Sequence, residues 1–307
     1  MAEQFPLDWL SSGRGIEPQL RWSSATDAPM VALALGSETG EVLAGDTSGG
    51  LYLLDRRGRV ATLTRGFHPL TALAWSDSGN GGAASIGDSK LCRLTNRLET
   101  AWSIELPDVI LCLAVDPFGE YVAAGLANGG NYVFDSQKKR VTTFETIRPL
   151  SFMRFLATEP TIVGAAEHGH LCCHRLTGEE IWSEKLWSNV GDMAVAGDGE
   201  TILLAGFSHG VQLFDGQGSN RGSFVIEGMP NRVSMSFLPN RLVASTLERH
   251  LYWLDSDGEM VWATVLPEDI CRVHCDPLGN WIVCGFVSGR IVRLDWDGPD
   301  QEDRIDP

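Results

Sequence analysis

A repeat with a constant spacing of 40 residues runs through this chain. Five copies of a short apolar segment that ends in Asp are spaced by multiples of 40 residues, and they begin at Leu51, Asn131, Val211, Leu251 and Ile291. Leu91 and Leu171 open two weaker copies in the same register, which makes seven copies in total. Periods of 20–50 residues indicate repeat architectures, so the unit of this fold is one 40-residue module.

The third copy shows what one module contains. Apolar runs at 111–115, 121–125, 131–135 and 140–144 are separated by Gly- and Pro-containing turns. Short runs with turn signals every 8–12 residues predict β-strands, and no window keeps an apolar i, i+3, i+4, i+7 spacing over helical length. Four strands in about 40 residues is the composition of a propeller blade. We therefore predict an all-β, seven-bladed propeller of four-stranded antiparallel blades.

The first strand of each copy has the most regular pattern. Its third position reads Leu33, Leu73, Leu113, Met153, Met193, Val233 and Val273. Two residues further on, the copies read Leu35, Trp75, Val115, Phe155, Val195, Met235 and Cys275. Because alternate residues share one face of a strand, we expect these 14 side chains to form the contacts between neighbouring blades.

The ring is expected to close on itself. Trp102, Trp182 and Trp262 mark the outermost strand, and the same register places Trp22 in an outer strand with no inner strands before it. The last copy, 271–295, has three strands. The N-terminal strand therefore completes the C-terminal blade, which removes exposed sheet edges.

The repeat defines three parts of the chain. Residues 18–296 form the predicted propeller, 1–17 an N-terminal arm and 297–307 an acidic C-terminal tail. The apolar stretch 5–10 is expected to pack against the protein's own rim, and a partner-binding arm is the alternative. The acidic tail is expected to be solvated.

Two turn types resemble known propeller families. The segments 116–121 and 276–281, which begin Asp-Pro and continue through Gly, resemble the turn after the first strand of WD40 repeats. Leu-Asp or Phe-Asp ends the third strand where that family has Trp-Asp, and its Gly-His pair is absent. The segments 177–182 and 255–262 are similar to the Gly-x-x-x-Trp docking element of quinoprotein-like propellers. The WD40 resemblance, over 18–296, implies a rigid platform for protein partners.

Composition narrows the functional classes. A formal charge of −16 argues against a nucleic-acid partner, which would require a basic stripe. The first residues lack the basic and apolar regions of a signal peptide, and no apolar stretch is long enough to span a membrane. An odd count of seven cysteines fits reduced thiols, so we expect a cytoplasmic protein.

Two clusters contain metal-ligating residue types. The first is His168, His170, Cys172, Cys173 and His174. The second is Cys271, His274, Cys275 and Cys284. Neither spacing matches a usual zinc pattern, and several members fall in core columns, so packing is favoured and no metal, cofactor or catalytic residue is predicted.

The strand positions expected to face the central axis are asymmetric. The first three copies are small and neutral there, whereas the last four carry Arg154, Asp192, Arg232, Arg272 and His274. Charges near an axis are costly unless they are paired or hydrated. One interpretation is an ion pair of Asp192 with a neighbouring arginine. The other is a central mouth that holds an anionic group or a partner's acidic residue, since arginine suits carboxylate and phosphate.

The loops that join blades, together with those between the second and third strands, are expected to share one face of the disc. We call it the loop face. Its candidate partner-binding residues are Phe67, His68, Ile147, Trp187, Phe207, Met229, His250 and Phe286. Exposed aromatic side chains beside arginines are typical of binding hot spots, and partial burial under a neighbouring loop is the alternative. The leading hypothesis is a non-catalytic interaction platform, a subunit or scaffold of a multiprotein complex. The alternative is a propeller that uses the central mouth to bind a small ligand or to act as an enzyme.

Overall fold

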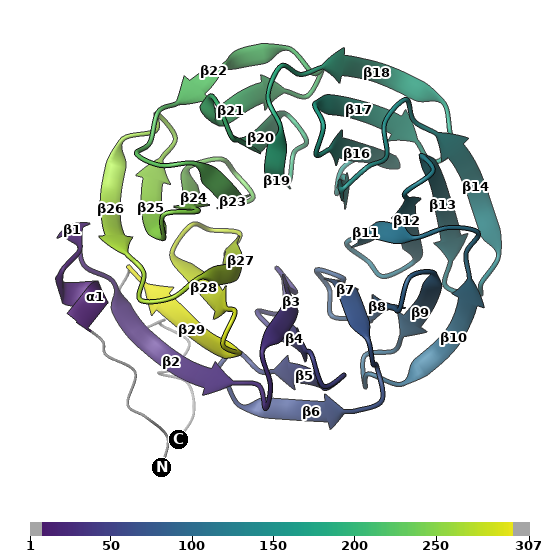
Figure 1. Cartoon of the computed structure of the whole chain (residues 1–307), viewed down its shortest axis with the longest axis horizontal. Coiled ribbons are helices and arrows are strands. Elements are labelled where there is room, and N and C mark those ends of the chain that lie inside the picture. The colour runs from purple at the N-terminus through teal and green to yellow at the C-terminus, as the bar shows by residue number, and fades with distance from the viewer. Residues whose placement is uncertain (1–7, 297–307) are drawn as a thin grey trace.

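A computed structural model describes residues 8–296 and confirms the predicted seven-bladed β-propeller (Figure 1). Each blade is an antiparallel sheet whose strands run from an innermost strand a to an outermost strand d. Blade 1 consists of β3 (Met30–Leu35), β4 (Val42–Asp46), β5 (Leu51–Leu54) and β6 (Val60–Thr64). Blade 2 consists of β7 (Leu70–Trp75), β8 (Gly82–Ile86), β9 (Lys90–Leu94) and β10 (Thr100–Glu105). Blade 3 consists of β11 (Ile110–Val115), β12 (Tyr121–Leu126), β13 (Gly130–Asp135) and β14 (Arg140–Glu145).

The remaining blades repeat this order. Blade 4 consists of β15 (Phe152–Phe155), β16 (Thr161–Ala166), β17 (His170–Arg175) and β18 (Glu180–Lys185). Blade 5 consists of β19 (Val190–Val195), β20 (Thr201–Gly206), β21 (Gly210–Asp215) and β22 (Asn220–Phe224). Blade 6 is β23 (Pro230–Met235), β24 (Arg241–Thr246), β25 (His250–Asp255) and β26 (Met260–Val265), and blade 7 is β27 (Ile270–Cys275), β28 (Trp281–Phe286), β29 (Arg290–Asp295) and β2 (Gln19–Ala25).

The Asp that ends strand c builds the c–d turn. In blade 3, the Asp135 carboxylate accepts hydrogen bonds of 2.9 Å from the backbone N–H groups of Gln137 and Lys139. Blades 1, 5 and 6 repeat the arrangement, and Thr95 takes the role in blade 2. The repeated Asp is therefore a turn residue, because a short acceptor side chain can bond its own backbone two residues on.

The two apolar columns of strand a pack each blade against the preceding one. Met193 of blade 5, for example, is fully buried among Val163 and Leu171 of blade 4. Leu33 of blade 1 lies against Val283 of blade 7 in the same way. The predicted role of these columns in the contacts between blades is confirmed.

The ring is closed by the chain's first long strand. β2 pairs antiparallel with β29 from Gln19 opposite Asp295 to Ala25 opposite Arg290. Figure 1 shows the purple N-terminal strand beside the yellow C-terminal strands. The prediction that the N-terminal strand completes blade 7 is confirmed.

The arm ahead of β2 holds structure that the sequence did not predict. A short helix, α1 (Asp8–Ser11), and a two-residue strand, β1 (Arg14–Gly15), lie on blade 6, where β1 pairs with β26. Blade 7 has no continuous c–d turn, because its strands c and d come from opposite ends of the chain. Trp9 of α1 packs in the core between blades 6 and 7, with ring centroids 6.4 Å from Trp262 and 6.3 Å from Phe286. This part of the arm packs on the protein's own rim.

Two predictions concern parts of the chain that lie outside the described residues, namely the start of the arm at 1–7 and the acidic tail at 297–307. Across residues 8–296, no helix has the length and apolar character needed to cross a bilayer.

Candidate functional site

A central channel runs along the axis of the ring. It encloses a cavity of about 310 Å³ lined by strand a of all seven blades. Strand a is an edge strand, so the backbone groups on its inner side have no neighbouring strand to pair with.

Polar side chains of one blade satisfy this inner edge on the next blade. The Asp192 carboxylate accepts hydrogen bonds from the backbone N–H groups of Met193 at 3.0 Å and Val233 at 3.3 Å. The Nε2 atom of His274 lies 3.1 Å from the carbonyl oxygen of Leu33. Asp192 and His274 therefore tie blade 5 to blade 6 and blade 7 to blade 1.

Arg232 ties three blades at once. Its Nε donates to the Cys271 carbonyl at 2.8 Å, and its Nη1 donates to the carbonyls of Asn231 at 2.7 Å and Gly191 at 3.2 Å. Within residues 8–296 no arginine nitrogen comes within 4.0 Å of an Asp192 oxygen. The ion-pair interpretation is therefore wrong, because both groups bond to backbone instead.

Arg154 and Arg272 differ from Asp192, Arg232 and His274, which bond to backbone groups of neighbouring blades. Their Nη1 atoms donate only to the carbonyls of the residues before them, Met153 at 2.9 Å and Cys271 at 3.4 Å. Both arginines line the channel. Of the five predicted mouth residues, these two keep the most N–H donors that no described residue accepts.

Burial lowers the pKa of His274 to about 4, and the positive charges of Arg154 and Arg272 push it in the same direction. His274 is therefore neutral at neutral pH, and we assign the Nε2 proton to the bond with the Leu33 carbonyl. A neutral imidazole in this role is a structural donor and adds no charge to the channel.

The loop face forms as predicted. The loops between strands d and a lie against the b–c turns of the following blade, as in the 2.9 Å bond from the Leu247 N–H to the Met229 carbonyl. The a–b and c–d turns occupy the opposite face of the disc, because successive strands of a blade run antiparallel.

Trp187 is the most prominent candidate on this face. Its side chain is 87 % exposed, and the Lys185 ammonium lies 5.3 Å from the centre of its ring. Ile147, in the equivalent loop one blade earlier, is 85 % exposed, and Met229, one blade later, is also exposed. These three side chains therefore present apolar surface to solvent.

Two predicted residues do not reach the surface. Phe67 is 7 % exposed in the core between blades 1 and 2, and Phe286 is fully buried in the core below α1. Assigning them to an exposed loop face was wrong, because the ring of Phe67 turns inward and Trp9 covers Phe286.

The other three predicted residues are partly engaged. His68 and His250 place Nδ1 at 3.0 Å and 3.2 Å from the carbonyls of Thr47 and Glu227. Phe207 is half-buried, and its ring covers Gly191. Each of them shapes the loop face but offers less free surface than Trp187.

Sequence reasoning missed three exposed apolar residues of blades 5 and 6. Val225 is 90 % exposed, and Val265 and Leu247 are also exposed. A signal was present: the column of Val225 and Val265 is otherwise Ala25, Arg65, Glu105, Glu145 and Lys185. A valine at the end of strand d, in a column that is otherwise mostly charged, could have identified these two exposed apolar residues from the sequence. With the three missed residues, six exposed apolar residues of the loop face lie on blades 4 to 6, while Val109, Leu111 and Val287 are exposed at blades 3 and 7.

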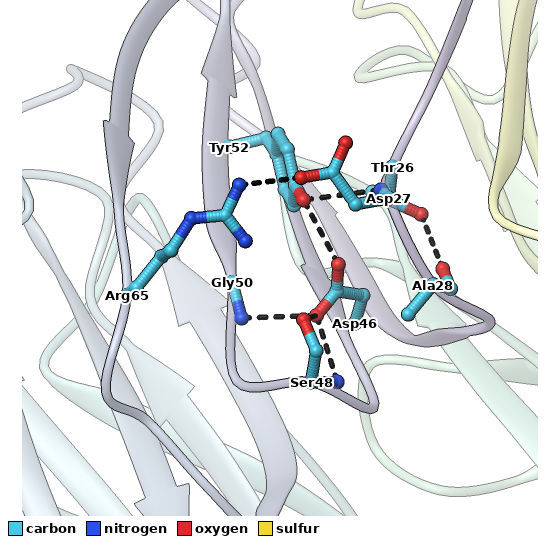
Figure 2. Close-up of polar contacts among 8 residues, drawn as sticks. All are labelled: Thr26, Asp27, Ala28, Asp46, Ser48, Gly50, Tyr52 and Arg65. Atoms are coloured by element: carbon cyan, nitrogen blue, oxygen red, sulfur yellow. Dashed lines mark hydrogen bonds and ion pairs between the residues drawn. The ribbon is translucent and has the colours of Figure 1, made fainter.

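The loop face of blade 1 is different, because its polar groups bond one another (Figure 2). The buried Asp46 carboxylate accepts bonds from the N–H groups of Ser48 and Gly50, and from the Tyr52 hydroxyl at 2.9 Å. Beside it, Arg65 pairs at 2.5 Å with Asp27, whose backbone N–H donates to the Tyr52 hydroxyl at 3.1 Å. Burial raises the pKa of Tyr52 to about 12, with the Asp46 carboxylate contributing, so the phenol stays protonated as a donor. This sector offers a closed polar network.

The two clusters of metal-ligand types lie mainly in the core. His174 stacks on Phe144 with ring centroids 4.3 Å apart, and burial lowers its pKa. Burial raises the pKa of Cys172 to about 12 and that of Cys173 to about 11. Throughout the described ranges, no three His, Cys, Asp or Glu side chains converge on a point where a metal could sit.

Comparison with known proteins identifies the fold. No protein-family model matches the chain, and no curated protein matches it. Among solved structures, the β-propeller domain of Cps50 (Swd1) from Myceliophteria thermophila superimposes with a TM-score of 0.77 at 16 % sequence identity. The match covers 91 % of this chain and 99 % of that domain. The chain is therefore similar to a complete propeller domain in fold, with little shared sequence.

Proposed function

We propose that this protein is a non-catalytic interaction platform, a subunit or scaffold of a multiprotein complex. It binds a partner protein through the loop face of blades 4 to 6. The single observation that supports this most strongly is the exposure of Trp187. A tryptophan that is 87 % exposed, in a loop whose backbone is held by the blades, leaves a large apolar surface without a covering.

The neighbours of Trp187 extend this surface. Ile147 lies in the loop one blade earlier, and Val225 and Met229 share the loop one blade later; all three expose apolar side chains. Aromatic residues and methionine are enriched in the centres of protein interfaces, where they fill pockets on the partner. The net charge of −16 supports a protein partner over a nucleic acid.

The reactive side chains support a non-catalytic role. Burial raises the pKa of every cysteine thiol, which keeps the thiols protonated and weakly nucleophilic. His274 and Asp192 are bonded to backbone groups of neighbouring blades. All seven cysteines are free, so we propose the cytoplasm as the compartment.

The test is a comparison of partner capture by two surface variants. The Trp187→Ala, Met229→Ala double variant removes side chains from the loop face. The matched control, Phe118→Ala with Leu278→Ala, removes exposed apolar side chains from the a–b turns on the opposite face. Proximity labelling in the source cells, quantified against wild type, measures each variant.

We expect the loop-face variant to lose its specific partners while the control retains them. Loss of a hot-spot residue costs about 2 kcal/mol or more, roughly a thirtyfold fall in affinity. Retention of every partner by the loop-face variant, with the same melting temperature as wild type, would disprove the proposed surface.

A further inference from the structure

We propose that the central channel binds a small oxyanion carrying at least two negative charges, held between Arg154 and Arg272. This site is separate from the loop face and does not depend on partner binding. Arg154 belongs to blade 4 and Arg272 to blade 7, three places apart in a ring of seven, so the two residues stand on nearly opposite walls.

The first argument is the number of unused donors. A guanidinium has five N–H groups. Arg154 and Arg272 each place one nitrogen on the carbonyl of the preceding residue and make no ion pair with any described residue. Most of the donors on both side chains are therefore available inside the cavity.

The second argument is the charge balance around the cavity. The Asp192 carboxylate accepts two backbone N–H bonds and forms no ion pair with Arg154 or Arg272, and Arg232 donates to three carbonyls and keeps its positive charge. His274 is neutral because its pKa is about 4. Asp77 borders the cavity from an a–b turn, where burial raises the pKa of its carboxyl group and the positive charge of Arg154 acts in the opposite direction.

The cavity lining holds two arginines, Arg154 and Arg272, and two carboxyl groups, Asp77 and Asp192, and Arg232 beside it adds a third positive charge in a chain whose net charge is −16. Screening confines exposed surface charges to about 8 Å at physiological ionic strength, so the nearby arginines dominate inside the channel. The local surplus is positive and attracts an anion.

The third argument is space. The part of the channel wall that blades 1 to 3 form carries small side chains: Ala32, Ala34, Ala72, Ala74 and Ala114. The cavity of about 310 Å³ is at the small end for ligand sites, which suits phosphate, a phosphate ester or a short polycarboxylate. Arginine recognises all three through paired N–H donors on two oxygens.

The experiment measures anion binding to the whole protein by isothermal titration calorimetry. Inorganic phosphate and citrate are the two probes, because they separate phosphate from carboxylate recognition, and chloride at equal ionic strength is the blank. The variants are Arg154→Gln, Arg272→Gln and the double variant. Arg221→Gln, which breaks an exposed 2.5 Å pair with Asp215 on the rim, is the matched control.

We expect saturable binding of at least one probe at one site per chain, unchanged in Arg221→Gln. Each single channel variant should weaken it at least fivefold, and the double variant should abolish it. If neither probe binds saturably, or if either single variant binds as wild type does, the proposal is wrong. Arg154→Lys and Arg272→Lys keep the charge and provide a second pair of tests should a glutamine variant misfold; they should bind more weakly than wild type but measurably.

Discussion

The indole nitrogen of Trp182 in blade 4 donates a 3.0 Å hydrogen bond to the carbonyl of Gly216 in the c–d turn of blade 5. Trp22 and Trp102 make the same bond to the residue 34 positions later in the chain, Arg56 and Ser136. Strand d of one blade is thus bonded to the outer turn of the next at three seams. Of the two segments that are similar to the Gly-x-x-x-Trp docking element, 177–182 makes this contact through Trp182, whereas Nε1 of Trp262 in 255–262 has no hydrogen-bond partner among the described residues.

This contact makes the turn glycine of the receiving blade intolerant of a side chain. A Cβ on Gly218 would lie 2.6 Å from the Trp182 ring, and its φ is +80°. We expect Gly218→Ala to lower the free energy of unfolding by about 2 kcal/mol or more, from overpacking added to backbone strain. Urea denaturation measures the change. Gly87→Ala is the control, because Gly87 has a φ of +61° and open space around it. An equal loss in both variants would mean that contact with the indole contributes nothing.

The arm is expected to stabilise the seam between blades 6 and 7. Trp9 is buried against Trp262 and Phe286, so Trp9→Ala should cost about 3–5 kcal/mol, the range for a buried aromatic side chain. Chemical denaturation of the variant checks this value.

Deletion of residues 2–26 goes further, because it also removes β2 and leaves β29 as an open edge. We expect that variant to melt lower than Trp9→Ala and to expand in small-angle X-ray scattering. A deletion variant with the melting temperature and radius of gyration of wild type would refute closure by β2.

The two kinds of channel arginine should respond differently to the same substitution. Arg232→Met removes the Arg232 donor from the carbonyls of Gly191 and Asn231 and leaves the Cys271 carbonyl with only the 3.4 Å bond from Arg272, so we expect a loss of about 2–4 kcal/mol. Arg154→Met removes one bond to its own neighbour and should change stability by less than about 1 kcal/mol. Thermal denaturation of both variants is the measurement, and a reversed order would contradict the assignment of Arg232 as a tie between blades.

Stability should fall in mild acid because of His274. Its pKa is about 4 in the fold, against an ordinary value of 6.5, so below pH 6.5 the unfolded chain binds the proton more readily than the fold does. The stability contributed by the neutral imidazole is complete above about pH 6.5 and is lost as the pH falls toward 4, a total of roughly 3 kcal/mol.

His274→Gln can still donate to the Leu33 carbonyl but does not titrate, so its stability should depend less on pH in this window. Burial also lowers the pKa values of His170 and His174, so the difference between wild type and variant isolates His274. Parallel pH profiles for the two proteins would show that His274 does not carry the effect.

The fold could be predicted from the sequence because each blade repeats the same physical requirements. The columns of Leu33 and Leu35 need apolar residues, and the Asp135 position needs a turn acceptor. Such requirements recur every 40 residues, so they are visible without coordinates. The pairing of β2 with β29 followed from the same register through Trp22.

The arm and the exposure of single side chains could not be predicted in this way. β1 and α1 occur once and have no column to compare with, and the burial of Phe286 depends on Trp9, which lies 277 positions away in the chain. The roles of Asp192 and Arg232 required knowledge of which backbone groups strand a leaves free. A charged residue at a repeat position shows that a polar side chain lies there, but only the three-dimensional structure shows which group it bonds.

The pairing of β2 with β29 also sets an order of events during synthesis. Ribosomes add about 5–20 residues per second, so roughly 15–50 s pass between completion of β2 and completion of β29. Throughout that interval the nascent chain carries a finished strand, Gln19–Ala25, whose partner has not been translated. The first long strand to leave the exit tunnel is therefore among the last to be paired, and until then it is open to capture by a chaperone.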